Sequence, residues 1–153
     1  MRLTTRGRYA VTAVLDLALH ADEGPVTLAD VAERQGISQA YLEQLFRRLK
    51  QHGLVVGARG PGGGYRLART LEDTSVSDII SAVGEGVDAT RCGGAGDCQD
   101  GEICLTHELW AELSQQIDLF LKRITFATLV ERRDIRSIAR RQDPKNLINA
   151  QML

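Results

Sequence analysis

The chain has 153 residues, of which 43% are hydrophobic and 25% are charged. These values are those of an ordinary globular domain, so they exclude a disordered chain and a collagen-like repeat. No apolar run approaches the roughly 20 residues that a membrane span needs, and no signal-peptide pattern opens the sequence. We therefore expect a soluble, cytoplasmic protein without a membrane partner.

The net charge of −1 conceals an uneven distribution. Residues 1–70 carry ten basic and six acidic side chains, residues 71–110 carry one arginine and nine acids, and residues 111–153 carry eight basic and five acidic side chains. A basic N-terminal region suits a polyanionic partner. All three cysteines fall in the acidic middle, which does not resemble a secreted disulfide framework. The distribution indicates two functions in one chain.

The first predicted element is a helix over residues 4–21, in which apolar residues recur at helical spacing. Thr27 is placed to cap a second, short helix, and Ser38 to cap a third that ends at Gly53. The two short helices are joined by residues 35–37 and have the outline of a helix-turn-helix. The second helix of such a unit enters the major groove of DNA, although an ordinary pair of core helices has the same outline.

A hairpin follows, because short strand patterns at residues 54–56 and 65–67 flank the glycine-rich run 57–64 (GARGPGGG). Such a tip lets the backbone approach a phosphate or enter a minor groove, where arginine is the favoured side chain. We therefore interpret the hairpin as a wing with Arg59 at its tip.

Candidate DNA contacts lie on the first helix, the third helix and the wing. Gln44 is suited to hydrogen bonding with a base edge. Glu43 is suited to accept a hydrogen bond from a cytosine amino group, or to repel DNA sites that offer it no donor. Tyr41 suits core packing and a phosphate contact equally well. The full set of expected DNA-binding residues is Arg2, Thr4, Arg6, Tyr9, Ser38, Gln39, Tyr41, Glu43, Gln44, Arg59, Gly60 and Tyr65.

Ser75 and Asp78 form a capping-box pattern that opens a helix through Val83, and residues 84–103 then read as a loop. The spacing Cys92-x5-Cys98-x5-Cys104-x2-His107 gives four ligands for one metal centre. From spacing alone three interpretations stay open. They are a structural zinc site, which usually shows closer cysteine pairs; an iron–sulfur cluster with three thiolates and one imidazole; and a thiol redox switch, which needs only two cysteines.

A long helix is predicted over residues 105–122, with apolar residues spaced three or four apart in a narrow seam that suits a partner helix. The fold class is mainly α. We expect a winged helix-turn-helix DNA-binding domain at residues 1–83, a metal-binding loop at 84–107, a dimerisation helix with a short following helix at 105–135, and a mobile polar tail at 136–153. No catalytic set is present: the glycine run lacks the Lys and Ser or Thr of a P-loop, so we expect no enzyme.

The sequence resembles a family of dimeric winged-helix transcription factors that includes the bacterial regulators of iron–sulfur cluster assembly. The resemblance rests on QGIS at 35–38, YLEQLF at 41–46, RGPGGGY at 59–65, VDATRC at 87–92 and CLTH at 104–107, and it covers roughly residues 1–135. Ala40 departs from the pattern, in which we expect a serine, and its missing hydroxyl removes one potential DNA contact.

The resemblance implies a [2Fe–2S] cluster bound by Cys92, Cys98, Cys104 and His107, and a homodimer built on the long helix. It also implies repression of cluster-assembly genes by the cluster-bound protein, control of other promoters by the apo protein, and delivery of the cluster by the assembly machinery. A zinc-stabilised or thiol-switched repressor of the same fold is the alternative, followed by a cluster carrier for which the winged helix is only a scaffold.

Overall fold

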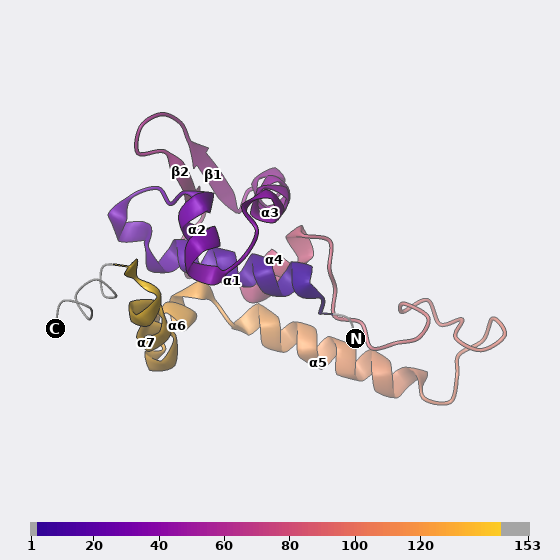
Figure 1. The fold of residues 1–153 in the computed structure, drawn as a ribbon. Helices are drawn as coiled ribbons and strands as arrows, with labels where there is room; N and C mark the ends of the chain where they lie inside the picture. The colour runs from indigo at the N-terminus through magenta and orange to yellow at the C-terminus, as the bar shows by residue number, and fades with distance from the viewer. Residues whose placement is uncertain (1–2, 145–153) are drawn as a thin grey trace.

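The structure is a computed structural model that describes residues 3–144 (Figure 1). In chain order the elements are α1 (Thr5–Leu19), a short 3-10 helix η1 (Ala21–Glu23), α2 (Leu28–Gln35), α3 (Gln39–Gln51), β1 (Val55–Ala58), β2 (Gly64–Leu67), α4 (Val76–Ala82), α5 (His107–Arg123), α6 (Phe126–Glu131) and α7 (Arg133–Gln142). No helix among the described residues is long and apolar enough to cross a membrane.

The predicted helix-turn-helix is formed by α2 and α3. The Thr27 hydroxyl accepts a hydrogen bond from the Asp30 N–H and begins α2, and the Ser38 hydroxyl accepts one from the Tyr41 N–H and begins α3. Gly36 ends α2 in the left-handed conformation, at φ 65°, which glycine adopts without strain. Local capping signals therefore set the bounds of both helices, as the sequence predicts.

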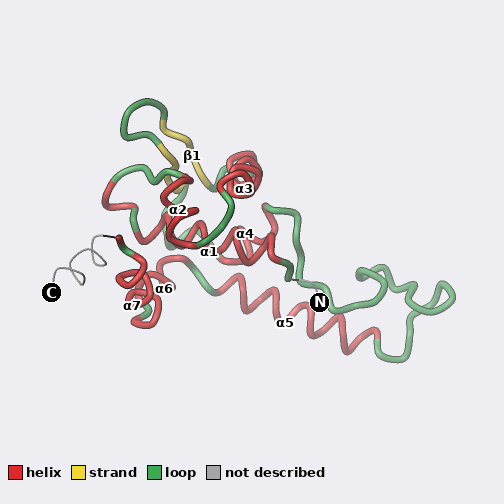
Figure 2. The backbone as a smooth tube through the Cα atoms, in the orientation of Figure 1, coloured by secondary structure: helices red, strands yellow, loops and turns green. Residues whose placement is uncertain are grey.

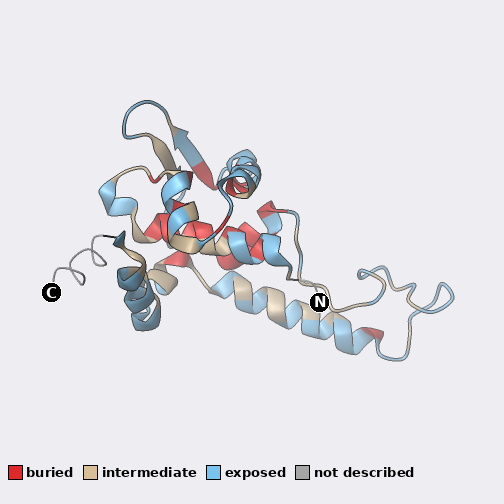
Figure 3. Cartoon of the chain, in the orientation of Figure 1, coloured by how far each residue is buried: buried red, intermediate tan, exposed pale blue. Residues whose placement is uncertain are grey.

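The core lies where one face of α3 packs against α1. The α3 side chains Leu42, Leu45, Phe46 and Leu49 are buried at a spacing of three or four, opposite Ala10, Ala13, Val14 and Leu17 of α1. Figure 3 shows the buried residues gathered along α1 and on the inner faces of the helices around it. Residues of the predicted DNA-binding domain form most of this core, to which Phe126 of α6 also belongs.

The wing is the antiparallel pair β1 and β2, with Val55 opposite Leu67 and Ala58 opposite Gly64 (Figure 2). The pairing is one to two residues longer toward the tip than the sequence predicts. An isolated bridge between Val26 and Tyr65 holds β2 against the segment before α2. The wing is therefore fixed to the helix-turn-helix at its base, and its tip extends into solvent.

α5 runs outside this core and returns to it at its C-terminal end. The Ser77 hydroxyl of α4 donates to the Asp118 carboxylate of α5 at 3.2 Å, and the Val76 N–H donates to the Ile124 carbonyl at 2.9 Å. Phe126, at the start of α6, is fully buried. The long helix is thus anchored beside α4, while its N-terminal half extends away from the core (Figure 1).

The prediction of a mobile tail from residue 136 is wrong over its first part, because residues 133–142 form α7. Ile135, Ile138 and Ala139 lie at spacings of three and four, and they line a small cavity of about 210 Å3 together with α1 side chains. These apolar residues form one stripe on a short, strongly basic helix, a pattern that the sequence itself carries and that the prediction overlooked. The rest of the predicted tail, 145–153, lies outside the described residues.

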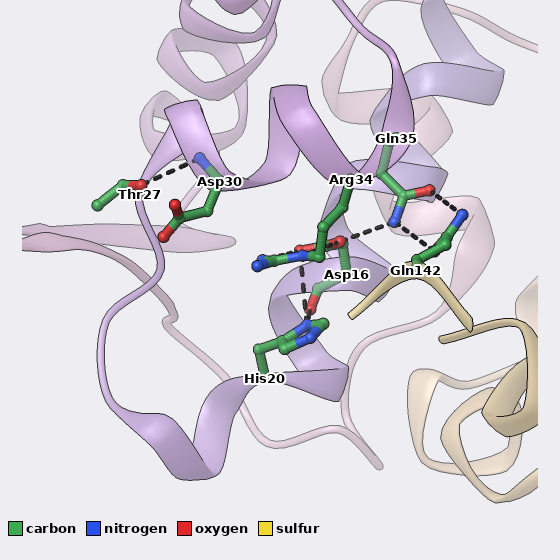
Figure 4. Close-up of polar contacts among 7 residues, drawn as sticks. All are labelled: Asp16, His20, Thr27, Asp30, Arg34, Gln35 and Gln142. Atoms are coloured by element: carbon green, nitrogen blue, oxygen red, sulfur yellow. Dashed lines mark hydrogen bonds and ion pairs between the residues drawn. The ribbon is translucent and has the colours of Figure 1, made fainter. Parts of the chain in front are cut away.

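A buried polar network joins α7 to the helix-turn-helix (Figure 4). The Asp16 carboxylate accepts from Arg34 Nε at 3.0 Å and Nη2 at 2.7 Å, and from the Gln35 amide at 2.7 Å. Gln35 in turn exchanges two hydrogen bonds with Gln142 of α7, at 2.9 and 3.2 Å. Asp16 has no exposed side-chain surface, so its charge depends on Arg34 for compensation.

Candidate metal centre and nucleic-acid interface

The cysteines lie in the exposed segment between α4 and α5, which extends beyond the N-terminal end of α5 (Figure 1). We call residues 84–107 the cysteine loop. The Ala89 N–H donates to the Ser114 hydroxyl of α5 at 2.7 Å, and the Asp88 carboxylate accepts from both the N–H and the hydroxyl of Thr90. These contacts fix the first part of the loop against α5.

Three of the four predicted ligands converge. The Nδ1 atom of His107 lies 3.5 Å from Cys92 Sγ and 3.6 Å from Cys98 Sγ, and the ligand atoms of the three residues all lie within 4.8 Å of one another. His107 is the first residue of α5 and is buried, so the helix fixes its position. The structure therefore brings together two thiols and an imidazole from three separate points of the sequence.

Cys104 lies beside this group and is not part of it. Its backbone N–H donates to Cys98 Sγ at 3.0 Å, while its own sulfur lies 4.0 Å from the Thr106 hydroxyl. Its thiol also interacts with that of Cys98, and this interaction is the main reason why the pKa of Cys104 is lowered. Cys104 is adjacent to the other donors, and its role as a ligand remains a prediction.

Hydrogen bonds set the ionisation of the thiols. The Gly96 N–H donates to Cys92 Sγ at 3.4 Å, and this backbone donor is the main reason why the pKa of Cys92 is lowered to about 6. For Cys98 the Cys104 N–H lowers the pKa, but the shared bond with the Cys104 thiol, burial and the nearby Cys104 charge outweigh it, so the pKa is raised. Near neutral pH Cys92 is therefore the thiolate and Cys98 the thiol of this pair.

The donor set fits a soft or borderline metal. Thiolates and imidazole are the ligands of zinc and of iron–sulfur clusters, and carboxylates are not needed. Two ligands of one tetrahedral zinc ion, a sulfur and a nitrogen, lie about 3.6 Å apart when bond lengths are ordinary, which is close to the two sulfur–nitrogen distances of His107. The loop residues are thus arranged for metal binding, and this geometry alone does not separate one ion from a cluster.

On the third helix, the predicted DNA contacts divide into exposed and supporting residues. Gln39, Glu43 and Gln44 are exposed on α3. The Ser38 hydroxyl serves as the helix cap, and the Tyr41 ring is half-buried and packs edge-on against Tyr9, with ring centroids 6.1 Å apart. The exposed α3 residues are free to approach a base edge, whereas Tyr41 supports the position of α1 against α3.

At the start of α1 the structure reveals a contact that the sequence does not suggest. The Glu85 carboxylate, from the cysteine loop, accepts from the N–H of Gly7 at 3.0 Å, from the N–H of Thr4 at 3.3 Å and from the Thr4 hydroxyl. The Thr4 hydroxyl is therefore engaged within the chain. Arg6 is exposed, and Arg2 lies outside the described residues.

On the wing, Arg59 and Gly60 lie at the exposed tip, and Gly60 adopts φ 88° there. Tyr65 differs from this pair. Its ring packs edge-on against Phe46 with centroids 4.9 Å apart, so it joins the wing to the core. The tip can enter a groove of DNA, and the Tyr65 ring is directed toward α3.

Comparison with known proteins agrees with this architecture. The profile of the Rrf2 family, described as an iron-dependent transcriptional regulator, matches residues 3–132. The chain belongs to the Rrf2 family. It is 58% identical over 143 residues to the HTH-type transcriptional regulator IscR of Serratia proteamaculans, covering 94% of this chain and 87% of the relative.

Two solved structures extend the likeness to the fold. IscR from T. potens has a TM-score of 0.71 at 40% identity, over 86% of this chain and 87% of its own. CymR, described as the global cysteine regulator of B. subtilis, has a TM-score of 0.74 at 29% identity, over 85% of this chain and 96% of its own. The match to the Rrf2 family and to the IscR relatives confirms the regulator fold and function that the resemblance implies. These relatives are named as regulators and not as enzymes.

Sequence reasoning missed two residues of this Rrf2 chain. Glu85 lies 78 positions from Gly7, and no local motif indicates such a contact. Arg48 follows Gln44 by four positions on α3, so helical spacing places both side chains on one face. The role of Glu85 could be found only from the structure, whereas the position of Arg48 could have been predicted from the sequence.

Proposed function

We propose that this Rrf2 chain is a DNA-binding transcription regulator that senses iron–sulfur cluster supply through a [2Fe–2S] cluster held by Cys92, Cys98, Cys104 and His107. The observation that carries the proposal is the convergence of Cys92, Cys98 and His107 within 4.8 Å in an otherwise exposed loop. The names of the IscR relatives and the description of the family as iron-dependent support it.

When bound, the cluster supplies a reversible cross-link between the cysteine loop and the first turn of α5. The chain's own residues relate this loop to the DNA-binding domain. Ser114 fixes the loop against α5, and Glu85 bonds the loop's beginning to the first turn of α1. Occupancy of the ligands therefore biases the position of α1, and with it the site preference of the helix-turn-helix.

The partner is double-stranded promoter DNA. Gln39, Glu43 and Gln44 contact base edges from α3, Arg59 and Gly60 enter the adjacent groove, and Arg6 contacts the backbone. The remaining predicted residues, Arg2, Thr4, Tyr9, Ser38, Tyr41 and Tyr65, support these contacts or add to them.

The protein acts as a homodimer through α5. Leu109, Leu113, Leu119 and Phe120 are exposed on this helix by 56%, 39%, 44% and 54%, which is unusual for large apolar side chains in a monomer. A two-fold dimer presents two α3 helices to two half-sites of an operator. The cluster-bound dimer represses cluster-assembly genes, and the apo dimer controls other promoters. The assembly machinery donates the cluster in the cytoplasm.

A second candidate is a zinc-stabilised repressor of the same fold. The observation that favours it is that three donors, Cys92, Cys98 and His107, converge on one point while Cys104 lies outside the group, as expected for a single ion with three protein ligands. In that case the metal fixes the loop permanently, and DNA choice does not follow iron supply.

The test selects preferred sites from a random duplex library with protein reconstituted with iron and sulfide without oxygen, and with the same protein after chelation. We expect the reconstituted protein to recover an additional class of sites. Cys98→Ser is the matched control, because it removes one ligand and should recover only the apo class under both conditions. Recovery of one and the same class by all samples would contradict cluster sensing and leave DNA binding intact.

A further inference from the structure

A groove of about 460 Å3 opens between α3 and α4, beside the exposed face of the proposed recognition helix. Its lining is polar and basic, and no carboxylate contributes to it. The residues that line it are Gln44, Arg47, Arg48, Gln51, His52, Ser81, Ala82 and Gly84. None of the metal ligands takes part, so this groove is separate from the cysteine site.

The two arginines of the groove are not neutralised. Within residues 3–144 neither Arg47 nor Arg48 forms an ion pair. Arg48 Nη1 donates to the Val83 carbonyl at 3.3 Å, just beyond the C-terminal end of α4, which holds the guanidinium at the groove wall. Two guanidinium groups without an acidic partner, one of them held in place by the backbone, form a site for an anion.

Gly84 keeps the groove open and brings a third arginine close. A Cβ atom on this residue would lie 3.0 Å from Arg48 Nη1 and 4.0 Å from Arg6 Nη1, and Gly84 also adopts φ 78°. Arg6 of α1 and Arg48 of α3 therefore approach the same point from two sides. Positive charge from two helices converges where α4 ends.

The groove lies along the later turns of α3, which would pass the edge of the DNA major groove when the N-terminal turns contact bases. Gln44, Arg47, Arg48 and Gln51 form one stripe at spacings of three and four. A recognition helix contacts base edges with its N-terminal residues, and its later turns pass the edge of a groove about 12 Å wide. Arg48 lies roughly 6 Å along the axis from Gln44, so it reaches the backbone when Gln44 reaches a base.

We infer that this groove holds a backbone phosphate of the bound DNA duplex between Arg47 and Arg48, with Arg6 adding charge from α1. The inference rests on the proposed DNA binding and adds to it a site that positions α3 in the major groove. A phosphate contact contributes affinity regardless of base sequence, and each one lost removes about one unit from the slope of log affinity against log salt.

The test measures binding of labelled duplexes of two unrelated sequences by fluorescence anisotropy, over a series of NaCl concentrations. The variants are Arg47→Gln, Arg48→Gln and Ser81→Asp, which places a carboxylate in the groove. Arg47→Lys and Ser81→Asn are their conservative partners, and Arg133→Gln on exposed α7 is the distant control. Thermal unfolding of each variant verifies that it is folded, since Arg48 also bonds to Val83.

We expect Arg47→Gln and Arg48→Gln to weaken binding about five- to tenfold on both duplexes and to reduce the salt slope by about one unit each. Ser81→Asp should weaken binding similarly, while Arg47→Lys, Ser81→Asn and Arg133→Gln should keep the native slope. A folded Arg47→Gln with the native slope overturns the phosphate site while DNA binding stands. Native protein that binds neither duplex overturns the proposed function together with this inference. If inorganic phosphate binds in the groove while the variants bind both duplexes as the native protein does, the groove is a site for a free anion, and the phosphate contact with DNA is overturned.

Discussion

The Glu85 carboxylate accepts a hydrogen bond from the Gly7 N–H at 3.0 Å, so the cysteine loop caps the first helix of the DNA-binding domain. The first N–H groups of a helix have no partner within the helix, and a carboxylate there also interacts favourably with the helix dipole. Glu85 lies seven positions before Cys92 in the sequence. Through this contact the segment that leads to the proposed metal ligands is hydrogen-bonded to α1.

Replacing Glu85 by Gln should weaken the connection between the loop and α1. We expect the ratio of DNA affinities with and without the reconstituted cluster to fall toward one, and the apo protein to lose about 1 kcal/mol of unfolding free energy, as for loss of a helix cap. Anisotropy titrations and urea unfolding measure the two effects. Glu102→Gln, an exposed acid elsewhere in the loop, should change neither.

Gly7→Ala tests the same contact from the other side. An added Cβ would collide with the Glu85 carboxylate, although alanine is the better helix former by about 1 kcal/mol. We expect a variant of near-native stability that has lost the cluster dependence of DNA binding. If Gly7→Ala and Glu85→Gln both keep the native ratio, the connection through Glu85 is wrong.

The hydrogen bond from the Gly96 N–H lowers the pKa of Cys92 to about 6, and this predicts selective alkylation of the metal-free protein. The thiolate is the reactive form, so the rate should rise with pH and reach half its maximum near pH 6. The pKa of Cys98 is raised, so Cys98 should react only in alkaline solution. Mass spectrometry of iodoacetamide-treated protein locates the label. The pKa of Cys104 is also lowered, so Cys104 takes label as well, and the peptide that carries the label distinguishes the two sites. Cys92→Ser should remove the labelling at position 92 that is half-maximal near pH 6, and Cys98→Ser should retain it; labelling of Cys92 centred near pH 9 would contradict the geometry at Gly96.

Removing Arg34 should destabilise the domain strongly. The Asp16 side chain is fully buried, and its charge is balanced by two hydrogen bonds from Arg34. We expect Arg34→Met to cost about 3–5 kcal/mol of unfolding free energy, because it removes the arginine from a buried carboxylate and leaves only His20, whose Nδ1 lies 3.7 Å away, as a basic side chain beside it. The double variant with Asp16→Asn should recover part of that loss. The exposed Arg132–Asp134 pair is the control, and Arg132→Met should leave stability unchanged within error. Equal effects of the two arginine changes would contradict this account.

The exposed face of α5 should hold the dimer together. Phe120 is 54% exposed on this helix, so Phe120→Glu should leave the fold of the chain intact while placing a charge in the proposed interface. Sedimentation equilibrium should show a dimer for the native protein and a monomer for the variant. Gln115→Glu, at an exposed position on the side of α5 away from Leu113 and Phe120, should remain dimeric. A native protein that sediments as a monomer would exclude the two-fold arrangement.

Signals that lie close together in the sequence account for the elements that could be predicted. Thr27 and Ser38 cap their helices through neighbours within three positions, and Ser75 with Asp78 forms the predicted capping box. The convergence of Cys92 and Cys98 with His107 was also predictable, because the four predicted ligands lie within 16 residues, although Cys104 stands beside the group.

Contacts between distant segments account for what the sequence did not indicate. The bond between Gln142 of α7 and Gln35 spans 107 positions, and no local motif indicates it. The Tyr65 ring follows the glycine-rich tip and was predicted to contact DNA, but Phe46 offers it a place in the core. Both contacts depend on which surface lies opposite the residue, whereas α7 itself follows a local pattern, the spacing of Ile135, Ile138 and Ala139.

The most direct test of cluster sensing is a visible absorption spectrum of protein purified without oxygen, with iron, sulfide and zinc quantified on the same sample. The account predicts a coloured protein with about two iron and two sulfide ions per chain, and loss of both from His107→Ala. A colourless protein that resists reconstitution with iron and sulfide and holds one zinc ion per chain would contradict it.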